Sequence, residues 1–412
     1  MTAERGWIGE PQPQREWNRS YASARADKIR AAQEQRRREI LQQVAAGEER
    51  RKQALAREPA GEPTVSVPSE RIQVQAKGRS TLADSVVQGY DIIGDIHGCA
   101  SQLEALLVEL DYEIAQGAGE YRHPHRQAIF VGDLIDRGPG QLRVLEVVKA
   151  MVEAGSAQIV MGNHEFNALA YHTEWPAGSG KHLRSRSKKH TEQHQAFLDQ
   201  LTEDQQRHYL DWFATFPLWL DLDGLRVVHA CWHDESIAVV QQRCGTAAPF
   251  TKVAHLVAAS DKGDPLYRAI ENLLKGPEIS LTARGYPAYK DKGGHDRDQA
   301  RTRWWDSEAR TLRQIAVMEA VELTVDDELY PELPELELLA DAMPYVYTDE
   351  IPVFYGHYWR RGKPEHRTAW TQHTACVDFS AVNDGALTAY SWSGETEIDP
   401  ANYHQLGAAQ RG

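Results

Sequence analysis

The stretch at residues 90–98, YDIIGDIHG, constrains this chain more than any other part of its sequence. Its apolar run is typical of a buried strand, and the run ends in Gly-Asp-x-His-Gly. Two later stretches have the same form: QAIFVGDLIDRGPG carries Asp133 and Asp136, and AQIVMGNHE carries Asn163 and His164. Each apolar run breaks at a glycine just before a polar side chain. The pattern predicts three strands that bring their polar ends to one rim.

The spacing of apolar residues predicts helices between these strands. We expect helices at 101–110 and 141–152, and strands at 90–93, 128–131 and 158–161. Repeated β-α-β units predict parallel strands with helices on the faces of the sheet, and ligands collect outside the carboxyl ends of such strands. Two further apolar runs, at 225–228 and 352–355, lead into His229 and His357.

The polar residues at these strand ends have the chemistry of a two-metal site. Carboxylate, imidazole and amide oxygen together suit manganese, our first choice, with iron or zinc as alternatives. A carboxylate that bridges two ions holds them about 3.5–4 Å apart, and Asp133 is the natural bridge. Arg137 can pair with phosphate oxygens through its planar guanidinium. His164 can protonate a leaving oxygen, with Asp136 to orient it and raise its pKa.

A single motif of this kind has a simpler interpretation, because an Asp after a glycine turn can merely cap the next helix. Three motifs on successive strand ends, followed by two strand-end histidines, favour the two-metal site instead.

The motifs GDIHG, GDLIDRGPG, GNHE, VVHA and YGH, in that order, resemble the calcineurin-like metallophosphoesterases. The resemblance is to the phosphoprotein phosphatase branch, which includes bacterial Ser/Thr protein phosphatases and symmetrical diadenosine tetraphosphate hydrolases. It covers about residues 90–229 and resumes at Phe354. It implies an α/β fold with a central β-sandwich flanked by helices, in place of an all-parallel sheet. Residues 375–393 then form an antiparallel hairpin around Asn383, Asp384 and Gly385.

The resemblance also implies roles for the strand-end residues. One metal would be held by Asp95, His97 and Asp133, and the other by Asp133, Asn163, His229 and His357. His164, paired with Asp136, would be the acid. A hydroxide that bridges the metals would attack phosphorus in line, without a covalent enzyme intermediate. The sequence departs from the family after two of the histidines, where Cys231 and Trp232 follow His229-Ala230 and Trp359 closes Gly-His-Tyr-Trp. The metal ligands of the family are kept, but we expect the walls of the pocket to differ from those of the family.

The interval between His229 and His357 is longer than in the protein phosphatases, which predicts an insertion on the substrate side at about residues 235–350. It contains Arg301 and Arg303, alternating as on one face of a strand, before Trp304 and Trp305. This run resembles an Arg-x-Arg run of dinucleoside polyphosphate hydrolases and implies a phosphate clamp beside an aromatic that stacks on a base. The alternative is a surface strand whose tryptophans are core.

Two charged segments have open interpretations. The acidic stretch at 326–341 favours a solvated cap helix or a partner surface. The basic segment at 181–189 is either a solvated loop or an entrance that attracts an anionic substrate. The histidines in and after it, at 182, 190 and 194, lack strand-end spacing and are not assigned as metal ligands.

The ends and the composition of the chain set wider limits. Residues 1–80 predict a charged extension, helical or partly disordered, and a linker; it could pack in an oligomer or act as a basic arm. Residues 81–412 are then the phosphoesterase domain. The formal net charge of −14 makes nucleic-acid binding an unfavoured function. Four widely spaced cysteines and the lack of an apolar leader or a membrane-length run predict a cytoplasmic protein with reduced thiols.

The sequence therefore predicts a metal-dependent phosphoesterase that hydrolyses phosphate esters or anhydrides, with nucleotides or small molecules as favoured substrates. A Ser/Thr or Tyr phosphoprotein phosphatase is the alternative, and a non-catalytic binding module on the same fold is a third interpretation.

Overall fold

The computed structural model describes residues 87–115, 120–291, 296–318, 321, 323–335, 337–339, 342–383 and 385–407. The predicted N-terminal extension at residues 1–80 and the domain start at 81 lie outside these residues. Within the described ranges, every helix is too short or too polar to cross a bilayer.

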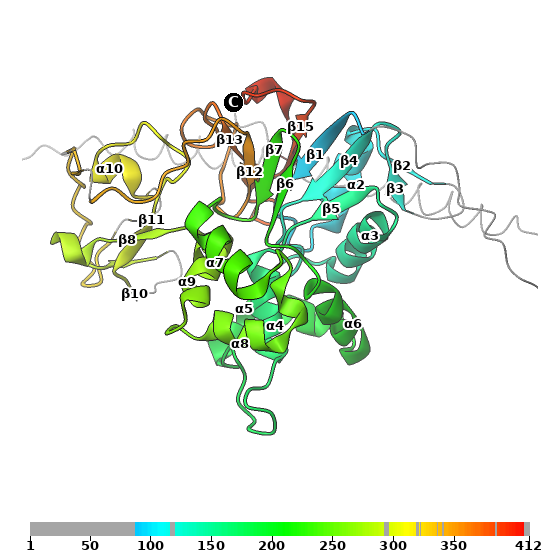
Figure 1. Cartoon of the computed structure of the whole chain (residues 1–412), viewed down its shortest axis with the longest axis horizontal. Coiled ribbons are helices and arrows are strands. Elements are labelled where there is room, and N and C mark those ends of the chain that lie inside the picture. Colours follow the sequence, from blue (N-terminus) through cyan, green and yellow to red (C-terminus); the bar gives the residue numbers. More distant parts are fainter. Residues whose placement is uncertain are drawn as a thin grey trace, which may run out of the picture. The chain divides into compact units, whose positions relative to one another are not determined.

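The larger sheet has the strand order β14-β15-β1-β4-β5, with β16 paired to β15 (Figure 1). Its strands are β1 (Gly89–Ile93), β4 (Arg126–Phe130), β5 (Ala157–Ile159), β14 (Asp378–Phe379), β15 (Ala386–Trp392) and β16 (Tyr403–Leu406). The predicted strands β1, β4 and β5 are parallel, and β15 runs antiparallel to β1. Parallel pairing brings the carboxyl ends of β1, β4 and β5 to one edge.

The second sheet has the order β13-β12-β7-β6. Its strands are β6 (Trp219–Leu222), β7 (Leu225–Val228), β12 (Val353–Tyr355) and β13 (Thr374–Cys376). β12 runs parallel to both β7 and β13, and β6 is antiparallel to β7. The ends of β7 and β12 therefore also point in one direction.

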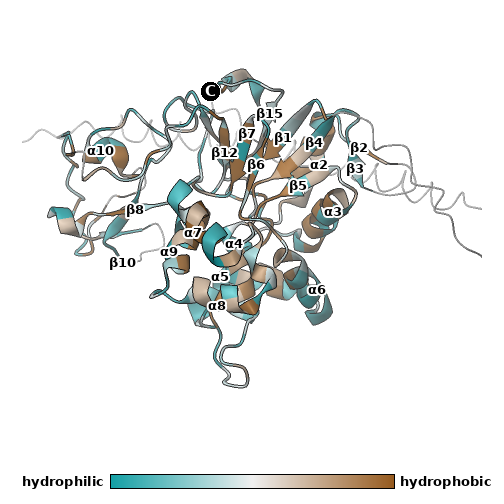
Figure 2. Cartoon of the chain, in the orientation of Figure 1, coloured by the Kyte–Doolittle hydropathy of each residue, from teal (hydrophilic) through white to brown (hydrophobic). Residues whose placement is uncertain are grey.

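The two sheets pack face to face. Ile92 and Ile129 of the larger sheet share one buried cluster with Val227 and Phe354 of the second sheet. Ile93, next to Ile92, belongs instead to the cluster that includes residues of the helices. Alternate side chains thus face the other sheet and the helices, as the two-residue period of a strand requires. Hydrophobic residues concentrate on these strands (Figure 2). The predicted sandwich is confirmed.

Helices follow the strands of the larger sheet, and the apolar spacing predicted two of them, at 101–110 and 141–152. They are α2 (Ala100–Glu109), α3 (Gln141–Glu153), α4 (Asn163–His172), α5 (Lys188–Gln200) and α6 (Glu203–Phe213). Leu103, Leu106 and Leu107 are the buried face of α2. A short antiparallel pair, β2 (Glu113–Ile114) and β3 (Tyr121–Arg122), lies between α2 and β4 in the sequence.

The predicted hairpin at 375–393 is only partly correct. β14 and β15 are antiparallel, but Cys376 belongs to β13 in the second sheet. The chain therefore crosses from one sheet to the other between β13 and β14, because alternating burial alone does not say which sheet a strand joins. Asp384, which was expected in the turn, lies outside the described residues.

The described residues of the range 235–350 form helices and short strand pairs. They include α7 (Asp234–Cys244), α8 (Val253–Ser260), α9 (Pro265–Lys275), β8 (Glu278–Ser280), β9 (Tyr289–Lys290), β10 (Asp296–Arg297), β11 (Gln299–Arg301) and α10 (Leu312–Ile315). Ile279, Leu281, Ala300 and Leu312 belong to a separate small buried cluster. That this insertion lies on the substrate side stays a prediction.

The cap helix expected at 326–341 is wrong for the residues described there, since none of them is helical. Pro331 and Pro334 lack the N–H that a helix needs and restrict the residues before them. Leu333 is buried, whereas Leu329 and Leu339 are 83% and 75% exposed.

Candidate active site

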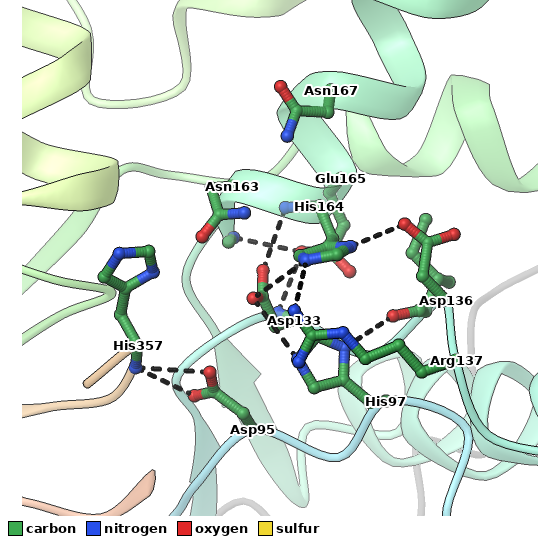
Figure 3. Close-up of polar contacts among 12 residues, drawn as sticks. Asp95, His97, Asp133, Asp136, Arg137, Asn163, His164, Glu165, Asn167 and His357 are labelled. Atoms are coloured by element: carbon green, nitrogen blue, oxygen red, sulfur yellow. Dashed lines mark hydrogen bonds and ion pairs between the residues drawn. The ribbon is translucent and has the colours of Figure 1, made fainter. Parts of the chain in front are cut away.

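The polar residues of the motifs lie just beyond the ends of five strands, β1, β4, β5, β7 and β12. Asp133 lies at the centre of this rim, with His97 and His164 on one side and His357 and Asn163 on the other (Figure 3). Asp95, His97, Asp133 and His229 are almost fully buried. The rim that the sequence predicted is present.

Two glycines explain why the motifs read Gly-Asp and Gly-Asn. Gly132 adopts a φ of +93°, and a Cβ on it would lie 2.3 Å from the backbone nitrogen of Gly162. A Cβ on Gly162 would in turn lie 2.3 Å from the backbone nitrogen of Asp133. The loops after β4 and β5 therefore approach so closely that neither position has room for a side chain.

Five functional residues adopt the left-handed backbone conformation that glycine normally favours. They are His97, Asp133, Asp136, Arg137 and His357, with φ between +46° and +71°. This conformation costs roughly 1–2 kcal/mol per residue. Backbone bonds hold it in place, since Ile96 and His97 both donate to the Asp133 carbonyl, at 3.2 and 2.9 Å. Such strain is typical of functional sites, where it aims side chains at one point.

Asp133 belongs to two clusters of potential metal ligands. One joins it with His97 and His164, and the other with His229 and His357. In each cluster the ligand atoms lie within 4.8 Å of one another. The side chain of Asp133 is therefore placed to be shared by two ions.

Main-chain carbonyls fix two of the imidazoles. The Nδ1 of His97 is 2.8 Å from the Ile135 carbonyl oxygen, and the Nδ1 of His229 is 2.7 Å from that of Val131. Because Nδ1 must donate to a carbonyl, Nε2 is left with its lone pair, the form that binds a metal. The Nε2 atoms lie 3.6 and 3.5 Å from the Asp133 carboxylate.

The pKa values of these groups favour the metal-binding forms. Burial, with the charges of His164 and Arg137, lowers the pKa of His97 to about 3. Burial, followed by the charge of Arg301, lowers the pKa of His357 well below its usual value. Burial alone would raise the pKa of Asp133, but the neighbouring histidines hold it below its usual range. The imidazoles of His97 and His357 are therefore neutral beside an ionised Asp133 carboxylate.

Asp95 and Asn163 lie beside these clusters. Both oxygens of Asp95 accept from the backbone nitrogen of His357, at 3.3 and 3.2 Å. The Oδ1 of Asn163 lies 3.1 Å from the Nε2 of His229. All six predicted ligands thus converge on the rim. The division of those ligands between two metals stays a prediction, because His164 stands in the cluster where Asp95 was expected.

His164 and Asp136 form the predicted pair. The Nδ1 of His164 is 2.5 Å from the Oδ2 of Asp136, while its Nε2 lies 3.9 Å from the Asp133 carboxylate. Burial would lower the pKa of His164, but the charges and hydrogen bond of Asp133 and Asp136 raise it. The same hydrogen bond helps to lower the pKa of Asp136 to about 2, against the effect of burial. His164 is thus favoured in its protonated form, with Nε2 toward the rim.

Arg137 contacts both histidines of the first cluster. Its Nη1 lies 3.0 Å from the Nε2 of His97, and its Nη2 lies 3.3 Å from the Nε2 of His164. The guanidinium stacks on the ring of Trp359, 4.1 Å from the ring centroid. Trp359 is 38% exposed, and its backbone nitrogen donates to Asp378 at 2.8 Å.

The insertion places Arg301 near the rim but buries both tryptophans. Arg301 donates to the Gly276 carbonyl at 2.8 Å and lies 3.6 Å from the Glu278 carboxylate. Trp304 and Trp305 are fully buried, and their indole N–H groups donate to Tyr358 Oη and the Arg367 carbonyl. The expectation that one of them stacks on a base is therefore wrong; they are core residues.

Arg303 lies two residues beyond Arg301, the last residue of β11. Its backbone nitrogen donates to the Ile315 carbonyl at 2.8 Å, which attaches this segment to α10. Phosphate binding by either arginine stays a prediction.

Two side chains that support the site were not identified from the sequence. Glu165 accepts from the backbone nitrogens of Asp133, Leu134 and Gly162, and burial raises its pKa to about 7. In a capping box, a Glu three residues after the N-cap accepts from the N-cap nitrogen, so the position of Glu165 three residues after Gly162 could have indicated this half of the motif. His194 lies 2.7 Å from the Oδ1 of Asp136. No local pattern signals it.

The basic segment at 181–189 does reach the site. Arg184 lines a cavity of about 20 Å³ together with Asp136, His164, His190 and His194. Its guanidinium donates to the side-chain oxygens of Asn167 and Gln193, both at 2.9 Å. Attraction of an anionic substrate by this segment stays a prediction.

Comparisons with known proteins agree with this geometry. Residues 90–306, more than half of the chain, match the family model described as calcineurin-like phosphoesterase. The chain is 33% identical over 141 residues to a bis(5'-nucleosyl)-tetraphosphatase PrpE [asymmetrical] of Oceanobacillus iheyensis, a match that spans 34% of this chain and 54% of that protein. It is 34% identical over 137 residues to a symmetrical bis(5'-nucleosyl)-tetraphosphatase of Chromohalobacter salexigens, over 33% of this chain and 41% of that protein.

The chain thus spans about half the length of these curated relatives or less. A solved protein serine/threonine phosphatase from Saccharomyces cerevisiae aligns over 81% of this chain and 83% of its own, at 12% identity and a TM-score of 0.41. The family match, together with the motif residues at the rim, decides the assignment. The chain belongs to the calcineurin-like phosphoesterase family.

Proposed function

We propose that this protein is a metal-dependent phosphoesterase that hydrolyses phosphate esters or anhydrides, with nucleotides as its preferred substrates. The observation that carries the proposal is the position of Asp133, whose carboxylate belongs to both ligand clusters. A carboxylate shared in this way is the element that holds two ions close enough to act on one phosphoryl group.

The residues present fit two divalent ions. The carboxylates, the imidazoles and the Asn163 amide oxygen are donors that suit manganese, and also iron or zinc. Asp133 would bridge, with Asp95 and His97 on one side and Asn163, His229 and His357 on the other. When bound, such ions supply an activated water and neutralise phosphate oxygens.

Three further residues serve the substrate, two by direct contact and one by orienting the acid. His164 gives the Nε2 proton to the leaving oxygen as the bond from phosphorus to that oxygen breaks. Asp136 fixes the ring of His164 through the 2.5 Å contact to Nδ1. Arg137, adjacent to both His97 and His164, pairs with the phosphate oxygens.

Three features support a nucleotide. The two curated relatives described above are both named bis(5'-nucleosyl)-tetraphosphatases. Trp359 exposes part of an aromatic ring next to Arg137, where a base could stack. Arg301 adds positive charge close enough to lower the pKa of His357, which favours a substrate with several phosphates.

The test is a hydrolysis assay with added manganese. Diadenosine tetraphosphate, p-nitrophenyl phosphate and a phosphoserine peptide are compared at equal concentration, with a chelated control. We expect activity that the chelator abolishes, and the highest kcat/KM for the dinucleotide. Preference for the peptide would replace the nucleotide proposal with that of a phosphoprotein phosphatase. If none of the three substrates is hydrolysed in a metal-dependent way, the proposal that the protein is a phosphoesterase is contradicted.

A further inference from the structure

We propose that His194 is a positioning residue for the acid His164 and acts through the carboxylate that the two histidines share. This inference rests on the proposed function. The Nδ1 of His164 contacts the Oδ2 of Asp136, and the Nδ1 of His194 contacts the Oδ1, at 2.7 Å. In the part of the chain that the structure describes, these two imidazoles are the only side-chain donors recorded for the Asp136 carboxylate.

The ring of His194 is itself held firmly. His194 lies on α5, is 5% exposed, and stacks on Phe197 with ring centroids 4.8 Å apart and an interplanar angle of 19°. The ring of Tyr171 meets it edge-on at 5.3 Å. Its Nε2 lies 3.3 Å from the Nε2 of His172. Packing on two sides and a contact at each nitrogen leave the imidazole a single orientation.

The hydrogen bonds between Asp136 and the two histidines follow from the charge of the carboxylate. An ionised carboxylate only accepts, so both Nδ1 atoms must donate to it. The Nε2 atoms of His194 and His172 lie 3.3 Å apart, so one ring donates a hydrogen bond to the other. Burial, together with the charge of His194, lowers the pKa of His172 to about 4, so the ring of His172 is neutral. His172, His194, Asp136 and His164 thus form one continuous row.

The backbone of Asp136 is fixed as well. Its nitrogen donates to the Oε1 of Gln141 at 2.7 Å, and its φ is +69°. The carboxylate can therefore adjust mainly by turning about its side-chain bonds. His194 prevents this turn, because turning would leave the buried Oδ1 without a donor.

The consequence for the reaction is specific to the leaving group. As the P–O bond breaks, its electron pair remains on the leaving oxygen, which takes the Nε2 proton and leaves His164 neutral. An alkoxide needs that proton, whereas p-nitrophenolate leaves without it. Loss of His194 should therefore slow the hydrolysis of alkyl phosphates much more than that of p-nitrophenyl phosphate.

The experiment compares His194→Asn, His194→Gln and His194→Leu in the full chain with manganese. The Asn amide nitrogen can occupy the place of Nδ1, whereas the Gln amide reaches the place of Nε2. We expect His194→Gln and His194→Leu to lose roughly 10- to 100-fold in kcat on an alkyl phosphate and less than about threefold on p-nitrophenyl phosphate. We expect His194→Asn to keep most of the activity on both substrates.

His190→Leu is the matched control. His190 lies one turn earlier on α5 and lines the same cavity, but its Nδ1 contacts the Ser185 carbonyl at 2.8 Å. It should not change the ratio of the two rates. Equal losses on both substrates in His194→Gln, or no rescue by His194→Asn, would overturn the positioning role. The paired amide variants keep the test valid where His194→Leu does not fold.

A second readout does not depend on turnover. In protein labelled with ¹⁵N-histidine, the His164 Nδ1–H resonance should lie downfield in the wild type and in His194→Asn, and should shift or broaden in His194→Gln. An unchanged resonance in His194→Gln would contradict the inference. A wild-type protein that shows the expected resonances but hydrolyses no phosphate would instead contradict the proposed function, so the two failures can be told apart.

Discussion

The rim of strand ends and the insertion at 235–350 are built in different ways. At the rim, each functional side chain follows a buried strand within a few residues and is fixed by backbone contacts, such as those between Nδ1 of His97 and the Ile135 carbonyl and between Nδ1 of His229 and the Val131 carbonyl. The insertion consists of helices and short strand pairs around a small cluster of its own. Its main effect on the site is electrostatic, because the charge of Arg301 lowers the pKa of His357.

This contrast indicates where the catalytic residues of the molecule must lie. A metal ligand needs its position fixed closely, and a strand end followed by a left-handed residue provides that. An electrostatic effect on the site tolerates a looser scaffold, because it falls off gradually with distance. We therefore expect substitutions at the rim to act on the reaction itself, and substitutions in the insertion to act on affinity, on pH dependence or on local stability.

The largest expected effect is that of Asp133→Asn at the rim. The amide keeps the shape of the side chain and can still accept from the backbone nitrogen of His164, which donates to Oδ1 at 2.9 Å. It loses the charge that both clusters share. We expect kcat to fall roughly 10³-fold or more, the effect of several kcal/mol of lost transition-state stabilisation. Kinetics and metal titration, with circular dichroism to confirm the fold, measure this.

The matched control is Asp296→Asn in the insertion. Asp296 is exposed on β10, and its replacement changes the net charge by the same amount. It should leave kcat and the metal stoichiometry unchanged. Similar losses in the two variants would mean that the net charge matters and the position does not, which would break the contrast between the two regions.

The same difference explains what the sequence could and could not predict. Asp95, Asp133 and His357 were identifiable because each follows a buried apolar run at a fixed offset. Such a pattern is local in the sequence and can be recognised without knowledge of the fold. His194 was not identifiable, because its contact with Asp136 joins residues 58 positions apart on a helix and a loop. Base stacking by one of the two tryptophans and burial of both in the core stayed open alternatives, because exposure cannot be read from two adjacent aromatics. Packing of Trp304 against Tyr355, with its hydrogen bond to Tyr358, decided for the core.

A smaller effect is expected for Arg301→Gln in the insertion. Losing one charge-assisted contact to a phosphate should raise KM for diadenosine tetraphosphate about tenfold, equivalent to roughly 1.4 kcal/mol, with little change for p-nitrophenyl phosphate. Burial is the main cause of the low pKa of His357, and Arg301 lowers it further. Without Arg301 this pKa rises, so protons compete more strongly with the metal as the pH falls.

Titrations of manganese at pH 6 and pH 8 measure this second consequence. The ratio of the two dissociation constants should be larger in Arg301→Gln than in the wild type. Arg297→Gln is the control, because Arg297 lies exposed on β10 and pairs with Asp291 at 3.0 Å. A ratio that is the same in all three proteins would exclude electrostatic coupling between the insertion and the rim.

The smallest expected effects separate the cores of the two regions. Ile279 belongs to the cluster of the insertion, and Ile92 to the cluster between the two sheets; the two clusters share no residue among those described. Ile279→Val and Ile92→Val should each cost about 0.5–1.5 kcal/mol of stability. Hydrogen exchange should show the loss of protection in β8 and β11 for Ile279→Val, and in β1 and β4 for Ile92→Val. Loss of protection in both regions for either variant would mean that they unfold as one cooperative unit. The looser scaffold of the insertion would then be coupled to the rim through packing as well as through charge.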